Sequence, residues 1–180
     1  MGSLRKGGNT EIAIKEALRI CKELGAETDL ITLYDKKIYD ICLDGQIEDD
    51  VLPILEKMKK ADAIIIGSPV YLGDISGVLK CLLDRCLIVK KRGMLFKNKI
   101  GGCIAVGAFW GHSRTLETLV HFFCGHAMLL ASVDIKPGIG IELWAREKGE
   151  LKEDKKELAK VQKLVYRIFE LLNYTNAVVK

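Results

Sequence analysis

Apolar residues recur along the chain with two different spacings, one typical of amphipathic helices and the other of buried strands. The helical spacing predicts five helices, over residues 10–25, 49–61, 76–89, 115–127 and 152–172. Short apolar runs between them predict four strands, over residues 26–33, 62–67, 99–107 and 128–137. The runs AIIIG and IGGCIAVG contain no charged position, so these two strands are expected to be buried on both faces, as in a parallel sheet.

Helices and strands alternate throughout, which is typical of an α/β fold whose helices cover both faces of a parallel sheet. The length suits one domain spanning residues 1–180. Ligands of such sheets bind beyond the carboxyl ends of the strands. Three glycine-containing loops are expected there, GSLRKGGNT (2–10), GSPVYLGDISG (67–77) and GAFWGHSR (107–114). These loops form the predicted ligand site.

The first of these loops has the features of a phosphate site. Its glycines allow backbone amides to turn toward an anion, its polar side chains add donors, and the following helix adds its positive N-terminal end. These residues are Ser3, Arg5, Lys6, Gly7, Gly8, Asn9 and Thr10. The loop matches neither G-x-x-x-x-G-K-[ST] nor G-x-G-x-x-G. One interpretation is a site for a phosphate monoester, and the other is a solvated loop in which Thr10 only caps the helix.

The second loop has the composition of a binding surface for a flat ring. Pro69 stiffens it, Tyr71 offers an aromatic ring, and Gly73 and Gly77 permit close approach to the backbone. A flat aromatic ligand can pack there and accept hydrogen bonds from the main chain. The alternative is an ordinary strand-to-helix turn in which Tyr71 covers the core.

Two of these motifs together resemble the NADPH-dependent FMN reductase family, with its iron–sulfur flavoprotein branch. They are GSLRKGGNT and GSPVYLGDISGVLKCLLDR (67–85), and TLVHFFCGHAM (118–128) resembles a later helix of the family. The likeness covers most of residues 2–135. It implies a flavodoxin-like three-layer sandwich with a five-stranded parallel sheet and FMN bound at the loops.

The resemblance also implies which residues hold FMN. The first loop would hold the phosphate, the second would line the flavin ring, and the third would lie beside it. The implied residues are Ser3, Arg5, Gly8, Asn9 and Thr10 in the first loop, Pro69, Val70, Tyr71, Leu72 and Gly73 in the second, and Gly107, Phe109, Trp110 and Gly111 in the third. Phe109 and Trp110 fit a flavin shield, a subunit interface or the core.

The implied activity is that of an NAD(P)H-dependent oxidoreductase. FMN would take a hydride from NADPH or NADH, and electrons would pass to a small-molecule or protein acceptor that the sequence does not name. We therefore expect no catalytic acid, base or nucleophile, and we interpret Asp84 and Arg85 as an ion pair at a helix end. The resemblance further implies a homodimer or homotetramer. A non-enzymatic electron carrier and a flavin-free truncated paralogue stay open as alternatives.

The cysteines and the third loop depart from the family pattern. The segment IYDICLDGQIEDD (38–50) contains only Cys42 where the iron–sulfur branch has a compact cysteine motif. A [4Fe–4S] cluster needs four thiolates, so no iron–sulfur cluster is expected, and the histidines are too scattered to predict a metal site. The third loop has Gly111, His112, Ser113 and Arg114 in place of G-G-Q-E. This difference leaves the substrate open.

The first strand of the family's fold is not present in the sequence, because only Met1 precedes the first loop. In the flavodoxin-like strand order 2-1-3-4-5 this strand is central, so its neighbours would lose backbone hydrogen bonds. Three explanations are open: a translation start upstream of Met1, a truncated paralogue, or another segment such as residues 176–180 in the vacant position. We expect the first, with about five apolar residues before Met1.

Charge and composition add mild constraints. The net charge is +4, and the lysines are dispersed among acidic residues, so nucleic acid is not an expected partner. No apolar run is long enough to span a bilayer, so no membrane association is expected. The N-terminus lacks the apolar segment of a signal peptide, which makes the cytoplasm the expected location.

Overall fold

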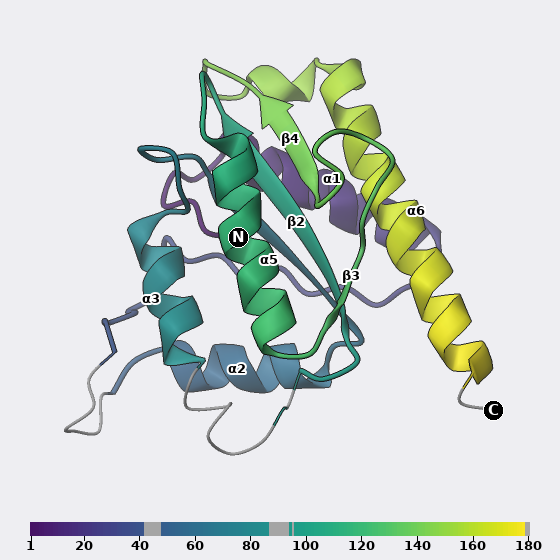
Figure 1. Ribbon diagram of the computed structural model, residues 1–180. Helices are drawn as coiled ribbons and strands as arrows, with labels where there is room; N and C mark the ends of the chain where they lie inside the picture. Colours follow the sequence, from purple (N-terminus) through teal and green to yellow (C-terminus); the bar gives the residue numbers. More distant parts are fainter. Residues whose placement is uncertain (42–47, 87–93, 95, 179–180) are drawn as a thin grey trace.

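The computed structural model describes residues 1–41, 48–86, 94 and 96–178, and shows a parallel sheet with helices on both faces (Figure 1). The strands are β1 (Ala63–Pro69), β2 (Ile100–Gly107), β3 (Leu129–Leu130) and β4 (Ile141–Trp144). The helices are α1 (Asn9–Glu23), α2 (Val51–Lys60), α3 (Gly77–Arg85), α5 (His112–Gly125) and α6 (Lys155–Val178), with a short 3-10 helix η1 (Glu150–Lys152) before α6. The predicted α/β class and its parallel sheet are confirmed.

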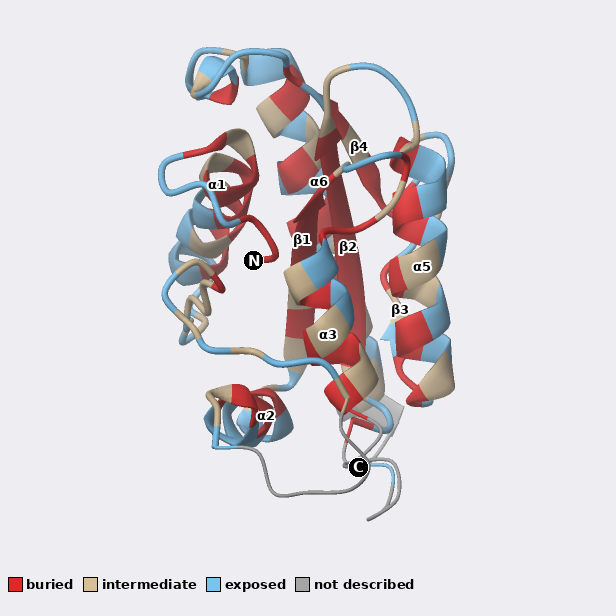
Figure 2. Cartoon of the chain, turned by 90° about the vertical axis from the view of Figure 1, so that its left-hand side faces the viewer, coloured by how far each residue is buried: buried red, intermediate tan, exposed pale blue. Residues whose placement is uncertain are grey.

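Two hydrophobic cores lie on opposite faces of the sheet. On one face, α2, α3 and α5 pack against inward side chains of the strands such as Ile64, Ile66 and Cys103. On the other face, α1 and α6 pack against Ile100 and Ile104. Figure 2 shows this burial, with the strands buried along most of their length. Because both faces are covered, β1 and β2 are nearly continuous apolar runs, as their sequences predicted.

Strand β2 lies in the middle of the sheet and is paired on both sides. It pairs with the whole length of β1, from Ala63 opposite Ile100 to Pro69 opposite Val106. Its other side pairs with β3 at one end and with β4 at the other. One continuous strand over residues 128–137 is therefore a wrong prediction. The Ala131 N–H still donates to the Gly101 carbonyl, and the chain then turns, with the Val133 N–H donating to the Gly138 carbonyl and the Gly138 N–H to the Ile135 carbonyl.

The outer edge of β4 is covered by side chains of α6. The Trp144 N–H donates to the Glu157 carboxylate at 2.9 Å, and the Lys160 ammonium donates to the Glu142 carbonyl at 3.1 Å. Lys160 and Glu157 also form an ion pair. Two of the backbone groups that β4 turns away from β2 thus have side-chain partners.

The predicted strand over residues 26–33 does not form. The position beside it holds only the first residues of the chain: the Met1 amine donates to the Ile31 carbonyl at 2.8 Å, and the Gly2 N–H donates to the Gly67 carbonyl at 2.7 Å. A strand needs a hydrogen-bonded neighbour along its length, and these two bonds supply it at one end only. Apolar residues alternate in this segment as in a strand. In the described structure, however, it lacks the row of hydrogen bonds to a neighbouring strand.

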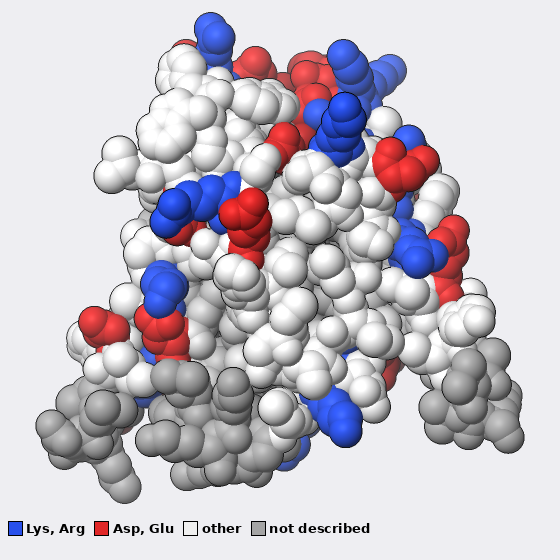
Figure 3. Space-filling model, in the orientation of Figure 1, with Lys and Arg blue, Asp and Glu red and all other residues white. Residues whose placement is uncertain are grey.

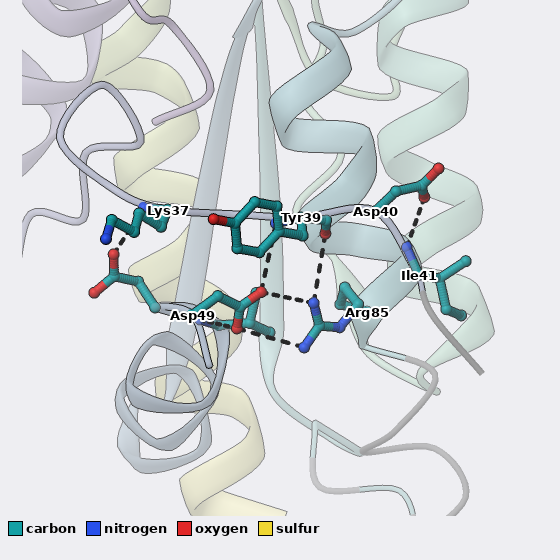
Figure 4. Close-up of polar contacts among 8 residues, drawn as sticks. Lys37, Tyr39, Asp40, Ile41, Asp49 and Arg85 are labelled. Atoms are coloured by element: carbon teal, nitrogen blue, oxygen red, sulfur yellow. Dashed lines mark hydrogen bonds and ion pairs between the residues drawn. The ribbon is translucent and has the colours of Figure 1, made fainter. Parts of the chain in front are cut away.

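A buried ion pair ties the segment before α2 to the end of α3 (Figure 4). The Arg85 guanidinium lies 2.6 Å from the Asp49 carboxylate, and both side chains are almost fully buried. Arg85 also contacts the Tyr39 carbonyl at 3.5 Å. The expected Asp84–Arg85 pair is wrong, because Asp84 instead pairs with Lys80, one helical turn away at 2.6 Å. Arg85 thus joins the segment before α2 to the end of α3.

Charged side chains of both signs are interspersed over the face shown in Figure 3. This distribution agrees with the mild net charge of +4. In the part of the chain that the structure describes, no helix combines the length and hydropathy needed to cross a membrane.

Candidate functional site

The first loop is held against the carboxyl end of β1 and the start of α3. The Ser76 hydroxyl donates to the Gly2 carbonyl at 2.5 Å, next to the bond from the Gly2 N–H to Gly67. Ser3 is buried, and its hydroxyl accepts a hydrogen bond from the Arg5 N–H at 3.1 Å. The predicted first and second loops are therefore joined directly by hydrogen bonds.

The chain turns into α1 at two glycines. Gly7 has φ +68°, and the Gly8 N–H donates to the Arg5 carbonyl at 3.1 Å. No side chain caps α1 at Gly8, so N–H groups of its first turn are open to an anion. Thr10 lies in this turn and is buried, with its methyl group packed toward Gly67. A simple capping role for Thr10 is excluded, because α1 begins before it.

Glu11 is a carboxylate below this turn that the sequence analysis did not single out. It accepts a hydrogen bond from the Gly7 N–H at 2.7 Å and lies 2.6 Å from the Lys15 ammonium. The hydrogen bond from Lys15 holds the pKa of Glu11 below its usual range, although burial acts in the opposite direction. The carboxylate is therefore ionised at neutral pH and holds the Gly7 turn in place.

Asn9 joins the first loop to the segment between β4 and α6. Its side-chain amide donates to the Glu147 carbonyl at 2.7 Å, and its oxygen accepts from the N–H groups of Gly149 and Leu151 at 3.0 and 3.3 Å. The side chain is thus engaged by the protein itself. What Asn9 presents at the start of α1 is chiefly its backbone N–H.

The second loop is a two-residue hairpin. Tyr71 and Asp74 exchange backbone hydrogen bonds of 2.9 and 3.1 Å, and between them Leu72 and Gly73 have φ values of +49° and +79°. Glycine suits such a position, whereas leucine adopts it only under strain. Pro69 is buried, but Tyr71 and Leu72 are 50% and 94% exposed. Tyr71 therefore does not cover the core.

The second and third loops pack directly on each other through glycines. A Cβ atom added to Gly111, whose φ is +90°, would lie 2.3 Å from the Gly73 Cα atom. One added to Gly107 would lie 2.9 Å from Val70. The Trp110 ring covers Gly73, where an added Cβ would lie 2.5 Å from it. No larger residue fits at these three glycines without moving a loop.

The aromatic residues of the third loop face solvent. Phe109 is 70% exposed and Trp110 is 63% exposed. The Arg146 guanidinium lies 5.4 Å from the centroid of the Phe109 ring, in a cation–π arrangement. A core role for these rings is therefore excluded, which leaves a flavin shield or a subunit interface.

His112 anchors the third loop to β4, a role that nothing in its sequence context indicated. It is the first residue of α5 and is buried, and its Nε2 atom lies 3.1 Å from the Leu143 carbonyl. A carbonyl only accepts hydrogen bonds, so Nε2 carries a proton. The ring packs on Trp144 with centroids 4.0 Å apart. The Nδ1 atom has no partner within the described residues.

Metal-binding side chains do not cluster in the described part of the chain. Cys42, on which the expectation about an iron–sulfur cluster depends, lies outside the described residues. Among the described residues, no three His, Cys, Asp or Glu side chains gather into a possible metal site. Burial raises the pKa of Cys86 and Cys103 to about 12, so both are protonated thiols.

The three loops form one continuous site at the carboxyl ends of β1 and β2. Gly2 connects the first loop to the second, and Gly73 with Gly111 connects the second to the third. At one end the site offers helix N–H groups for an anion. At the other end it offers close-packed backbone and exposed rings, which suit a flat ligand.

Comparison with known proteins gives a family match and several relatives. A family model described as NADPH-dependent FMN reductase matches residues 1–135. An iron–sulfur flavoprotein of Methanocaldococcus jannaschii is 42% identical over 139 residues, covering 72% of each chain. A second iron–sulfur flavoprotein of that organism is 33% identical and covers 95% of this chain and 93% of the relative.

Solved structures show the same fold at low sequence identity. The structure of RosB with a bound riboflavin-5'-phosphate derivative has a TM-score of 0.78 and 17% identity, covering 97% of this chain and 77% of RosB. The Trp repressor binding protein of Bacillus subtilis has a TM-score of 0.69 and 21% identity, covering 89% of this chain and 93% of that protein. The flavodoxin-like fold is therefore confirmed.

Replacing Gly111 by alanine is expected to separate the second and third loops. The new Cβ would overlap Gly73 at a φ that alanine does not favour, so the free energy of unfolding should fall by roughly 2–4 kcal/mol. Urea denaturation measures this change. The matched control is Gly125→Ala in α5, where nothing lies within 4 Å of an added Cβ. Equal stability of the two variants would contradict the packing of these loops.

Proposed function

The chain belongs to the NADPH-dependent FMN reductase family, and on that premise we propose that it takes a hydride from NADPH or NADH onto FMN bound at the three loops. As a member of the family it is an FMN-binding flavoprotein and an oxidoreductase. The electrons then pass to a small-molecule or protein acceptor. The observation that carries this proposal is the direct connection of an anion-binding helix start to a glycine-lined surface for a ring.

The first loop fits the phosphate of FMN. No side chain caps the backbone N–H groups at the start of α1. These groups form the positive end of the helix dipole, which attracts an anion. Arg5 and Lys6 are exposed beside them. The segment held by Asn9 adds a further cation, because the Lys148 Cε atom lies 3.8 Å from a Cβ built on Gly7. Arg5, Lys6 and Lys148 thus add positive charge near the proposed phosphate position, where the Glu11 carboxylate, paired with Lys15, is the opposing charge.

The second and third loops fit the flavin ring. The turn from Val70 to Gly73 presents its backbone at the surface, and the contact between Gly73 and Gly111 holds it against the third loop. FMN supplies the hydride chemistry when bound, so the residues of this chain need only orient the ring and limit its contact with water. Exposed Tyr71 and Phe109 are placed to do the latter.

The experiment that tests this function is an FMN titration followed by anaerobic reduction. We expect the purified protein to bind FMN and to lose its visible flavin absorbance when NADPH or NADH is added. Binding without such bleaching would favour an electron carrier, and no binding would favour a flavin-free protein. We also propose that no iron–sulfur cluster is present, so iron and sulfide analysis of anaerobically purified protein should find neither in stoichiometric amount.

Changing Thr10 to valine tests the proposed phosphate position. Valine keeps the shape of the side chain but removes the hydroxyl, so FMN affinity should fall roughly tenfold, which corresponds to the loss of one charge-assisted hydrogen bond. Binding of riboflavin, which lacks the phosphate, should not change. Thr32→Val, outside the three loops, is the control, and fluorescence titration measures all three proteins. An equal loss for FMN and riboflavin would show that Thr10 does not serve the phosphate.

We further propose that the chain forms a homodimer or homotetramer through the exposed rings of the third loop. Phe109 and Tyr174 in α6 are similarly exposed, but Phe109 has exposed Trp110, Tyr71 and Leu72 in the neighbouring loop positions. Light scattering should therefore give a mass of at least twice 20.1 kDa. Phe109→Ser should weaken association, whereas Tyr174→Ser should not. A monomer at micromolar concentration would count against this proposal.

A further inference from the structure

A fourth segment, residues 145–151, lies beside the three loops of the site. It connects β4 to α6, and Figure 1 shows it at the upper end of the view, between the tip of β4 and the start of α6. The family model matches residues 1–135, so this segment lies outside the matched part of the chain. What it does at the site is therefore not implied by the family match.

The segment is attached to the first loop by the side chain of Asn9. The Asn9 amide donates to the Glu147 carbonyl at 2.7 Å, and its oxygen accepts from the N–H groups of Gly149 and Leu151 at 3.0 and 3.3 Å. Both ends of the amide group are thus used on one stretch of backbone. Because Asn9 is the first residue of α1, these bonds fix the segment relative to the start of that helix.

Further hydrogen bonds fix the shape of the segment. The Ala145 N–H donates to the Gly107 carbonyl at 2.9 Å, which continues the ladder between β4 and β2. The Glu150 carboxylate accepts from the N–H groups of Arg146 and Glu147 at 2.5 and 2.9 Å. The backbone is therefore held in place along its length, although most of its side chains are exposed.

This backbone places Lys148 beside the turn into α1. Its Cε atom lies 3.8 Å from a Cβ built on Gly7, and the ammonium is one bond further along the side chain. The N–H groups at the start of α1 have no side-chain cap. An anion bound at this turn would therefore have both backbone donors and the lysine ammonium within reach.

Two carboxylates of this region already have other partners. The Glu11 carboxylate is paired with Lys15, and the Glu150 carboxylate accepts the two N–H bonds described above. Glu147 is exposed, so water and salt screen its charge. A phosphate group, which is compact and carries up to two negative charges, is the ligand group that suits the Lys148 ammonium.

We propose that residues 145–151 form a fourth loop of the FMN site, in which the Lys148 ammonium binds the phosphate and Asn9 is a positioning residue that holds the loop within reach. This role rests on the proposed binding of FMN at the first loop. Lys148 is then a determinant of specificity, because riboflavin has the same ring but no phosphate. Asn9 contributes to phosphate binding through the fourth loop, and its side chain does not contact the ligand.

The experiment measures affinity for FMN and for riboflavin in parallel, by fluorescence titration at low and high salt. Lys148→Met keeps most of the apolar stem and removes the charge. We expect its FMN affinity to fall roughly five- to tenfold and to depend less on salt, with riboflavin affinity unchanged. The control is Lys155→Met at the start of α6, which removes an equal charge outside the fourth loop and should change neither affinity.

Asn9→Ala tests the positioning role. It removes the bonds to the fourth loop and should weaken FMN binding by a similar factor, again without an effect on riboflavin. If Asn9 acts through Lys148, the double variant should lose no more affinity than either single variant, because residues that act as one unit are not additive.

Glu150 provides a second test of the loop that leaves α1 intact. Glu150→Ala and Glu150→Gln lose the same charge, but only the glutamine keeps an acceptor oxygen for the N–H groups of Arg146 and Glu147. We expect the alanine variant to bind FMN more weakly than the glutamine variant. This difference should disappear when Lys148 is replaced by methionine.

Equal FMN affinity and equal salt dependence in the unmodified protein and Lys148→Met would overturn the proposal. Additive losses in the double variant would overturn the role of Asn9, because its side chain would then serve the phosphate independently of Lys148. If the unmodified protein bound FMN and riboflavin equally, the proposed phosphate position and the fourth loop would both be wrong. A preference for FMN that survives in Lys148→Met would overturn the fourth loop alone.

Discussion

The pairing of β1 with β2 is the constraint on which the rest of the structure depends. The ladder runs in register from Ala63 to Pro69 and continues beyond the strands through the bond from the Val70 N–H to the Val106 carbonyl. The second loop leaves the sheet at Val70, and the third starts one residue after Val106. Because the ladder places these two points side by side, the loops meet where Gly73 contacts Gly111. The bond from Gly2 to Gly67 brings the first loop to the same end of the sheet.

The site is therefore assembled mainly by backbone contacts. Several of its side chains bind other parts of the protein. Glycines at 73, 107 and 111 allow the loops to touch, and Glu11 and His112 fix two turns from below. This arrangement agrees with a family in which the cofactor supplies the chemistry and the protein supplies its position.

Much of the fold could be predicted from sequence because the relevant signals are local. Helix α1 and strands β1 and β2 follow from apolar periodicity and from the glycines that bound them. The segment over residues 26–33 has an equally good strand pattern, yet it is not a strand, since pairing depends on a neighbour and not on the segment itself. Strand β4 was missed because four residues after a glycine-rich turn carry little periodicity.

The candidate site was predicted in outline, but its internal connections were not. The three loops do meet, as the rule for parallel sheets requires. The part played by Asn9 could not be seen, because its partners are 138–142 residues away in the sequence. The buried position of His112 likewise depends on Leu143, in a strand that the pattern did not reveal.

The two edges of the sheet differ in how readily they could associate with other chains. At the edge formed by β3 and β4, Glu157 and Lys160 bind outer backbone groups of β4, and residues 131–140 interrupt the edge. An incoming strand would therefore find few free donors or acceptors in a row. Natural proteins use such interruptions to prevent edge-to-edge aggregation. The edge of β1 differs, because among the described residues Gly2 alone bonds to its backbone, and α1 with residues 26–31 covers it across a cleft. An incoming strand would therefore find a row of free backbone groups only at β1, and only by entering that cleft, so polar substitutions at β4 would do little to change strand addition.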